Sequence, residues 1–374
     1  MKILQFVDNF YPHIGGAQYV AGELARAQAA RGDNVEIVVT GPRGELPTDD
    51  SWSGIPVHRF DFRTALEQKD IGKILSVRNM VKKLREAFRP DVTHVHLWGP
   101  GAALHLQTHQ TSPGPWVVTV HVPVPKPAHG SADNVGNILR SASAVAAISD
   151  YSRQSILAHT GPTSRVRLIY NAIRMPNRSF AALPWQPPLL LCMGRHVPEK
   201  GFDLAIEALA RVLGRIPDAR LMIVGDGPAR ASLERRASDL GVAGRTEFLG
   251  WVPPDEVPDV LDRSTIMLVP SRWEEPFGLV AVEAALAGRP VVATRTGGLS
   301  EVVLDGRTGI VVPVDDVEAM ADAMVQLLGD RDLAIKLGRN AADSARNRFG
   351  LESFIANYDD LYRNVVKDWA GQKS

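Results

Sequence analysis

Short, continuous apolar runs alternate with longer amphipathic stretches along most of the chain, and this alternation restricts the possible folds more than any other feature. Clear examples of the runs are ILQFVD, VEIVVT, WVVTVH, LLLCMG and TIMLVP. Strands that are apolar on both faces are typical of a parallel sheet covered by helices on both sides. The pattern therefore predicts an α/β architecture in which helices connect the strands of doubly wound sheets.

The length of the chain indicates more than one domain, because 374 residues exceed what one hydrophobic core usually serves. The alternation pauses at residues 175–188, where MPNRSFAALPWQPP is proline-rich and has no apolar periodicity. We therefore expect a Rossmann-like domain at 1–174, a linker at 175–188 and a second Rossmann-like domain at 189–350. Residues 351–374 are expected to form a helix, and one option is that this helix returns to the N-terminal domain.

The composition excludes several classes of protein. Lys+Arg and Asp+Glu both total 42, so no net field attracts nucleic acid. The single cysteine, Cys192, rules out an internal disulfide framework and fits a reducing compartment. Because the sequence has no apolar run of about 18 residues and no secretory leader, we expect a cytoplasmic protein.

Two loops that each precede a helix have the composition of anion sites. Gly15 and Gly16 lie in FYPHIGGAQYV, where the helix start favours an anion, although a simple tight turn explains them equally well. In MGRHVPEKGFDLAIEAL, Arg195 and Lys200 flank the turn that opens a helix, which suits a diphosphate. The alternative is that these are two solvated surface cations.

A dinucleotide fingerprint is missing. VGDGPAR has only Gly225-x-Gly227 and does not follow the first strand of the chain, and the first strand itself does not lead into GxGxxG. A nicotinamide- or flavin-linked oxidoreductase is therefore disfavoured, but it stays the alternative from a different class of enzyme.

The run EEPFGLVAVEAALAGRP places two acids in different local structures. Glu275 precedes the helix that GLVAVEAALAG predicts, whereas Glu283 lies more than one turn inside it. Pro276 makes a helical conformation at Glu275 unfavourable, so the spacing of eight does not guarantee a facing pair.

Together, EEPFGLVAVE, MGRHVPEKG, FYPHIGG and GGLSEVVLDGRTGIVV resemble the motifs of the retaining glycosyltransferases of family 4. This resemblance covers nearly the whole chain and implies the GT-B fold, in which two Rossmann-like domains face each other across a cleft. It also implies a nucleotide diphosphate sugar as donor and no metal cofactor.

The resemblance further implies a role for individual residues. Arg195 and Lys200 would bind the diphosphate, Glu275 the sugar hydroxyls and Glu283 the ribose hydroxyls. His121 would stabilise positive charge that develops on the sugar, although Val122 stands where the family commonly has Asp. The remaining donor-binding positions implied in this way are Gly15, Gly16, Val252, Phe277, Gly278, Leu279 and Val280.

Two other features have alternative interpretations. His94-x-His96 has the spacing of ligands on one face of a strand, but no Cys or carboxylate with suitable spacing completes a metal site, so we expect strand-end histidines near the acceptor. Residues 70–89 predict a basic amphipathic helix, which either packs on the sheet or gives peripheral contact with the inner face of a membrane.

The sequence thus predicts a retaining, metal-independent hexosyltransferase. Its donor would be a UDP- or GDP-sugar, and its acceptor a glycolipid, a surface polysaccharide precursor or a small metabolite. A Rossmann oxidoreductase and a non-catalytic nucleotide-sugar-binding protein are the alternatives.

Overall fold

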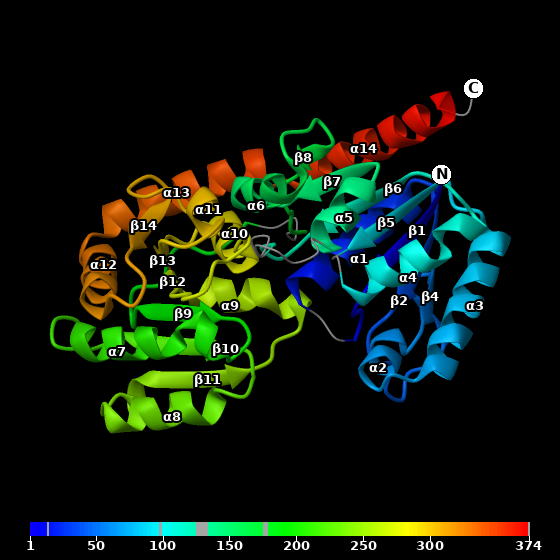
Figure 1. Ribbon diagram of the computed structural model, residues 1–374. Coiled ribbons are helices and arrows are strands. Elements are labelled where there is room, and N and C mark those ends of the chain that lie inside the picture. The colour runs from blue at the N-terminus through cyan, green and yellow to red at the C-terminus, as the bar shows by residue number, and fades with distance from the viewer. Residues whose placement is uncertain (13–14, 97–98, 125–133, 175–178, 373–374) are drawn as a thin grey trace. The chain divides into compact units, whose positions relative to one another are not determined.

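The structure is a computed structural model that describes residues 1–12, 15–96, 99–124, 134–174 and 179–372. The chain divides into two compact units (Figure 1). Unit 1 comprises Met1–Asn171 and the segment that starts at Leu351, and unit 2 comprises Ala172–Gly350. Sequence analysis placed the end of the first domain at residue 174, three positions beyond this division.

Unit 1 is built on an eight-stranded sheet with the strand order β3-β4-β2-β1-β5-β6-β7-β8. All neighbouring strands are parallel except the β3–β4 pair at one edge, which is antiparallel. The strands are β1 (Lys2–Val7), β2 (Asn34–Val39), β3 (Asp49–Trp52), β4 (Ile55–Arg59), β5 (Val92–His96), β6 (Trp116–Val120), β7 (Ala144–Ala147) and β8 (Val166–Leu168).

The helices of unit 1 connect these strands, and one arrives from the far end of the chain. They are α1 (Gly16–Ala30), α2 (Phe62–Glu67), α3 (Ile71–Phe88), α4 (Pro100–Thr108), the 3-10 helix η1 (His109–Thr111), α5 (Asn134–Ser141), α6 (Asp150–Thr160) and α14 (Leu351–Gly371). The helix α14, red in Figure 1, is tied to the sheet by buried hydroxyls. The Tyr358 hydroxyl lies 2.8 Å from the Thr119 hydroxyl, and the Tyr362 hydroxyl lies 2.5 Å from His94 Nδ1.

Unit 2 contains a six-stranded parallel sheet with the order β11-β10-β9-β12-β13-β14. Its strands are β9 (Leu189–Met193), β10 (Arg220–Val224), β11 (Thr246–Gly250), β12 (Ile266–Val269), β13 (Val291–Thr294) and β14 (Gly309–Val312). Its helices are η2 (Pro198–Lys200), α7 (Phe202–Val212), α8 (Arg230–Asp239), η3 (Ala243–Arg245), η4 (Pro254–Glu256), α9 (Val257–Arg263), α10 (Leu279–Leu286), α11 (Leu299–Val302), α12 (Val317–Gly329) and α13 (Arg331–Arg348).

Each unit has its own core, as the uninterrupted apolar runs predict. In unit 1 the core includes Phe6, Val95 and Val118 from three adjacent strands, and in unit 2 it includes Leu190, Ile223 and Leu268. The predicted α/β class with two Rossmann-like domains is confirmed. Since ligands of open α/β sheets bind beyond the carboxyl ends of the strands, these edges are where a ligand site is expected.

Candidate functional site

The carboxyl edge of the unit 2 sheet brings Glu275 and Lys200 together, although 75 positions separate them in the sequence. Glu275 lies in the loop between β12 and α10, and Lys200 is the last residue of η2, after β9. The Glu275 carboxylate forms an ion pair with the Lys200 ammonium and accepts a 2.8 Å hydrogen bond from Ser271 Oγ. The Glu275 side chain is buried, and the two donors, Lys200 and Ser271, hold its charge in one position.

The backbone of Glu275 is fixed as firmly as its carboxylate. Its carbonyl accepts a 2.7 Å hydrogen bond from Gly298 N. The preceding residue, Gly297, has a φ of +49° and packs against the Glu275 backbone. A Cβ at Gly297 would stand 2.2 Å from the Glu275 carbonyl oxygen, so only glycine allows this close approach. The GGLSEVV motif therefore supports the loop that carries Glu275.

Sequence analysis missed the two side chains that surround this ion pair. Ser271 and Trp273 lie in SRWEE, between the end of β12 and Glu275, and the Lys200 ammonium is 6.0 Å from the centre of the Trp273 ring. The signal was available, because polar residues directly after a buried strand lie at the carboxyl edge of the sheet.

Arg195 follows β9 and has an exposed side chain, whereas the loop around it is rigidly held. Gly225, with φ of +117°, packs against this loop so closely that a Cβ would stand 2.0 Å from the Gly194 carbonyl oxygen. His196 N donates to the Asp226 carbonyl at 2.8 Å. Gly225 and Gly227 of VGDGPAR thus shape the loop that presents Arg195, a role that the sequence motif alone does not indicate.

The start of α10 has the geometry of an anion site. Gly278 is the N-cap in a left-handed conformation and provides no side-chain acceptor. The first amides of a helix have no acceptor within the helix and carry its positive dipole end, and here they belong to Leu279 and Val280. Phe277 is buried, and Val252 is half-buried in the loop that follows β11.

Glu283 lies inside α10, whereas Glu275 lies before it, as the sequence predicts. The Glu283 side chain is half-buried, and surrounding protein atoms desolvate it enough to raise its pKa from 4.5 to about 7. Among the contacts of the described residues, no hydrogen bond joins Glu275 to Glu283.

In unit 1 the structure places His121 in a buried row of histidines. It directly follows β6, and its Nε2 atom lies 3.1 Å from His96 Nδ1. Burial lowers the pKa of His121 to about 4, so the ring is neutral near pH 7. The predicted Gly15 and Gly16 are exposed at the start of α1, with no side-chain cap.

Two parts of the predicted site region stay outside the described residues. The loop VPVPKPAHGSADNVG, expected to shape acceptor choice, lies mainly in 125–133, and the predicted linker includes residues 175–178. Within the described ranges, no group of three or more His, Cys, Asp or Glu side chains is arranged to hold a metal ion.

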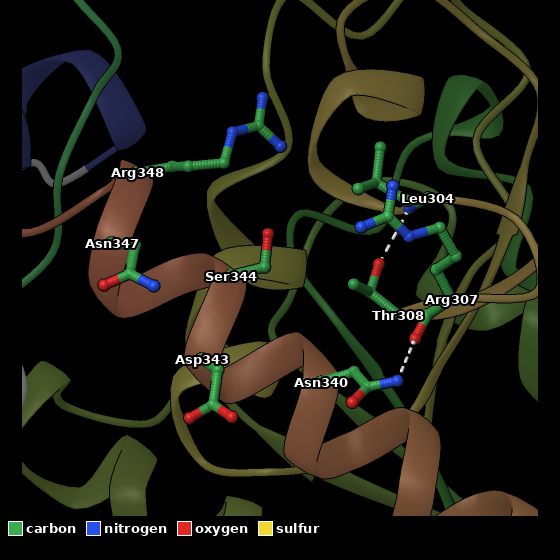
Figure 2. Close-up of a pocket in the computed structure, with 8 residues that line it drawn as sticks. All are labelled: Leu304, Arg307, Thr308, Asn340, Asp343, Ser344, Asn347 and Arg348. Carbon is green, nitrogen blue, oxygen red and sulfur yellow. Dashed lines mark hydrogen bonds between the residues drawn. The ribbon is translucent and has the colours of Figure 1, made fainter.

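A cavity of about 410 Å³ lies elsewhere in unit 2, between α13 and the loop that follows α11 (Figure 2). Arg307 and Arg348 contribute positive charge, but Asp343 and the C-terminal half of α13 contribute negative potential. Arg348 also donates to the Glu301 carbonyl at 2.7 Å. None of the predicted donor-binding residues lines this cavity.

Comparison with known proteins assigns the chain to a family. Residues 14–175 match the family model "Glycosyltransferase Family 4", and residues 176–344 match "Glycosyl transferases group 1". The chain belongs to the group 1/family 4 glycosyltransferases. It is therefore a glycosyltransferase of the GT-B fold, and the oxidoreductase alternative is not supported.

Individual relatives differ in how much of the chain they match. The chain is 26% identical to the N-acetyl-alpha-D-glucosaminyl L-malate synthase of Bacillus anthracis over 372 residues, 96% of each protein. It is 42% identical over 157 residues to the GDP-mannose-dependent alpha-(1-6)-phosphatidylinositol monomannoside mannosyltransferase of Mycolicibacterium smegmatis, which is 40% of this chain and 41% of that protein. The chain thus spans less than half of the length of this second relative.

A solved structure supports the fold. Anabaena HepE in complex with UDP and glucose aligns with a TM-score of 0.77, at 21% identity, over 96% of this chain and 98% of that one. This group of glycosyltransferases uses nucleotide sugars as donors, which agrees with the predicted class of substrate.

Proposed function

We propose that this chain transfers a hexose from a UDP- or GDP-sugar to an acceptor hydroxyl, with retention of the anomeric configuration. The observation that carries the proposal is the buried Glu275 carboxylate, which Lys200 and Ser271 hold at the carboxyl edge of the unit 2 sheet. A fixed acceptor of hydrogen bonds at this edge suits the hydroxyl groups of a sugar.

The diphosphate would bind to Arg195, Lys200 and the first amides of α10. Lys200 and the helix start are parts of the folded protein before any ligand arrives, so little reorganisation accompanies binding. These groups supply the positive field that a metal ion gives in other transferases, and on this ground we propose a metal-independent reaction.

The two glutamates would bind opposite ends of the donor. Glu275 takes the sugar hydroxyls, Glu283 takes the ribose hydroxyls, and the backbone at Val252 contacts the base. A glycosidase-like pair needs both carboxylates at the scissile bond, about 5–5.5 Å apart for retention. Because Glu283 binds the ribose and only Glu275 lies at the sugar, such a pair is absent from this mechanism. The departing phosphate is instead the group that accepts the proton of the attacking hydroxyl.

His121 would stabilise the positive charge that develops on the sugar. A neutral imidazole is required for this role, since an imidazolium would repel that charge. The burial that lowers the pKa of His121 to about 4 provides the neutral form.

The relatives define which donors are worth testing. One relative's name specifies GDP-mannose, another an N-acetylglucosaminyl group, and the HepE structure contains UDP and glucose. We therefore propose glucose, mannose or N-acetylglucosamine as the hexose. The acceptor would be a glycolipid, a surface polysaccharide precursor or a small metabolite.

Peripheral contact with a membrane is part of this proposal. The helix α3 exposes Ile71, Leu75 and Met80 to solvent, with exposed fractions of 70%, 49% and 40%. Lys73 and Lys83 are exposed on the same helix, which gives the apolar and basic combination of an interfacial helix. None of the described helices has both the length and the apolar character to span a membrane.

A donor screen and one substitution test the proposed reaction. We expect UDP- or GDP-hexoses to raise the melting temperature of the whole protein, because they bind only the folded state. Glu275→Gln keeps the size of the side chain but weakens its pairing with Lys200, and it should remove most transfer activity. Near-normal turnover in this variant would refute the role of Glu275, and the neighbouring exposed Glu274→Gln is the matched control.

A further inference from the structure

A small cavity lies at the carboxyl edge of the unit 1 sheet. It holds about 10 Å³ and is lined by Val7, Asp8, Asn9, Ala17, Gln18 and His96. The first three residues lie at the end of β1 or directly after it, His96 ends the neighbouring β5, and the other two lie in the first turn of α1. This volume is close to the minimum that one water molecule occupies, so the cavity fits a single hydroxyl-sized group.

His96, which lines this cavity, has a buried nitrogen without a hydrogen-bond partner among the described residues. His96 is 2% exposed, and among the described residues its Nε2 atom has no hydrogen-bond partner. A buried polar atom without a partner costs about 1–3 kcal/mol, so native proteins seldom keep one without a bound water or a functional reason. The other nitrogen of this ring, Nδ1, lies 3.1 Å from His121 Nε2.

The charges around the cavity select a neutral occupant. Asp8 is buried, but Thr40 and the Gly101 amide donate to one of its oxygens at 2.7 and 3.0 Å. Arg63 donates to the other oxygen at 3.0 Å, so the carboxylate is already neutralised and has no need of a cation. An anion would meet this carboxylate at the cavity wall, whereas a hydroxyl group can both donate and accept there.

The pairing of the two imidazoles makes His96 a link between the cavity and His121. Burial and neighbouring histidines lower the pKa of His96 well below 6.5, so each ring carries one proton. If His121 Nε2 donates to His96 Nδ1, then His96 presents an N–H donor to the cavity. If His96 Nδ1 donates instead, His96 Nε2 is an acceptor and His121 carries its proton on Nδ1. The group in the cavity therefore selects the tautomer of His121.

We propose that this cavity binds one hydroxyl group of the acceptor, and that His96 is the positioning residue that couples its binding to the tautomer of His121. Water occupies the cavity when the acceptor is absent. No proton is gained or lost by the protein, because hydrogen bonds are only redistributed. This inference rests on the proposed function for its catalytic consequence, whereas the coupling of the two rings does not depend on it.

Nitrogen NMR of the complete, histidine-labelled protein tests the coupling without any substrate. We expect His96→Phe, which keeps a planar ring but cannot hydrogen-bond, to shift the His121 Nε2 signal and change its tautomer ratio. His96→Gln, which can still donate and accept, should restore part of the wild-type ratio. His58→Phe is the matched control, since His58 lies in β4, pairs with Glu36 and Asp49, and does not line the cavity.

A hydroxyl probe tests the cavity itself. Titration of the wild-type protein with glycerol should shift the His96 Nε2 signal to a plateau, and Ala17→Val, which fills the cavity, should abolish this shift. Unchanged His121 signals in a folded His96→Phe variant would overturn the coupling. A glycerol response that survives in Ala17→Val would overturn the assignment of the cavity.

Kinetics separate this inference from the proposed function. With UDP-glucose or GDP-mannose as donor and glycerol as acceptor, His96→Phe should lower kcat/KM for glycerol about tenfold, the equivalent of one hydrogen bond. KM for the donor should stay unchanged. A wild-type protein that turns over no nucleotide sugar contradicts the proposed function, whereas the NMR result still decides the coupling. An unchanged kcat/KM for glycerol in an active His96→Phe variant would overturn the positioning role.

Discussion

Glu283 is predicted to lower the stability of the ligand-free protein. Its carboxylate is half-buried in α10, and desolvation is the cause of its raised pKa. Without a nucleotide, no described residue compensates this charge by a hydrogen bond or an ion pair. Replacement by the neutral, isosteric Gln should therefore stabilise the ligand-free protein at neutral and alkaline pH.

The size and sign of this effect follow from the two pKa values. In the folded protein the carboxyl releases its proton near pH 7, and in the unfolded chain near 4.5. The folded state thus holds more protons between these values, so stability falls as the pH rises through this window. At 1.36 kcal/mol for each pH unit, ionisation costs the wild-type protein about 3 kcal/mol above pH 7. Below pH 4.5 the cost is absent.

Urea unfolding of wild type and Glu283→Gln at pH 4.5 and 8.5 measures this difference. We expect nearly equal free energies of unfolding at pH 4.5, and a variant that is about 2–3 kcal/mol more stable at pH 8.5. Glu274→Gln, which changes an exposed glutamate in the loop before α10, should show no such pH dependence. A Glu283→Gln variant with the same advantage at both pH values would refute the reasoning.

The same substitution should weaken nucleotide binding. If the Glu283 carboxylate accepts hydrogen bonds from the ribose, its replacement by an amide removes charge-assisted bonds worth about 1.5–3 kcal/mol. Calorimetry with UDP and GDP at pH 8.5 should then show an affinity at least about tenfold lower. A more stable variant with unchanged affinity for both nucleotides would assign Glu283 no role in donor binding.

Three further substitutions test other contacts. Ser271→Ala removes the donor to Glu275, so kcat should fall and stability decrease by about 2 kcal/mol; an unchanged kcat in steady-state assays would contradict the positioning of Glu275. Gly225→Ala puts a Cβ within 2.0 Å of the Gly194 carbonyl oxygen at a φ of +117°, and should lower the melting temperature and the affinity for UDP; a wild-type melting curve argues against the clash. Tyr362→Phe removes the hydroxyl that bonds to His94, so urea unfolding should show a loss of about 1–2 kcal/mol, and no loss would mean that α14 does not depend on this contact.

Much of the fold was predictable, because burial on both faces leaves a strong signal in the sequence. Each quoted run that predicts a strand, from ILQFVD to TIMLVP, overlaps an observed strand. One observed strand was not predicted from the sequence. It is β3, Asp49–Trp52, whose residues DDSW are mostly exposed. This edge strand pairs antiparallel with β4 and has no buried face, so it lacks the apolar pattern that marks the others.

The candidate site was only partly predictable. The positions of Glu275 before α10 and Glu283 inside it follow from Pro276 and from the helix pattern, both local features. The ion pair between Glu275 and Lys200 is not local, because it depends on β9 and β12 being neighbours in the sheet. The same is true of Gly225, whose closeness to Gly194 depends on the pairing of β9 and β10.

The sequence by itself determined the α/β class, the division into two domains, the helix starts that suit an anion and, through its motifs, the family. Only the tertiary structure decided which side chains meet. The contact between His96 Nδ1 and His121, the His96 Nε2 atom without a partner among the described residues, and the cavity that His96 lines all arise when β1, β5, β6 and α1 come together. The physical reason is that periodicity and capping act between near neighbours, whereas strand order and burial, which desolvate a group and fix its partners, are set by residues far apart in the chain.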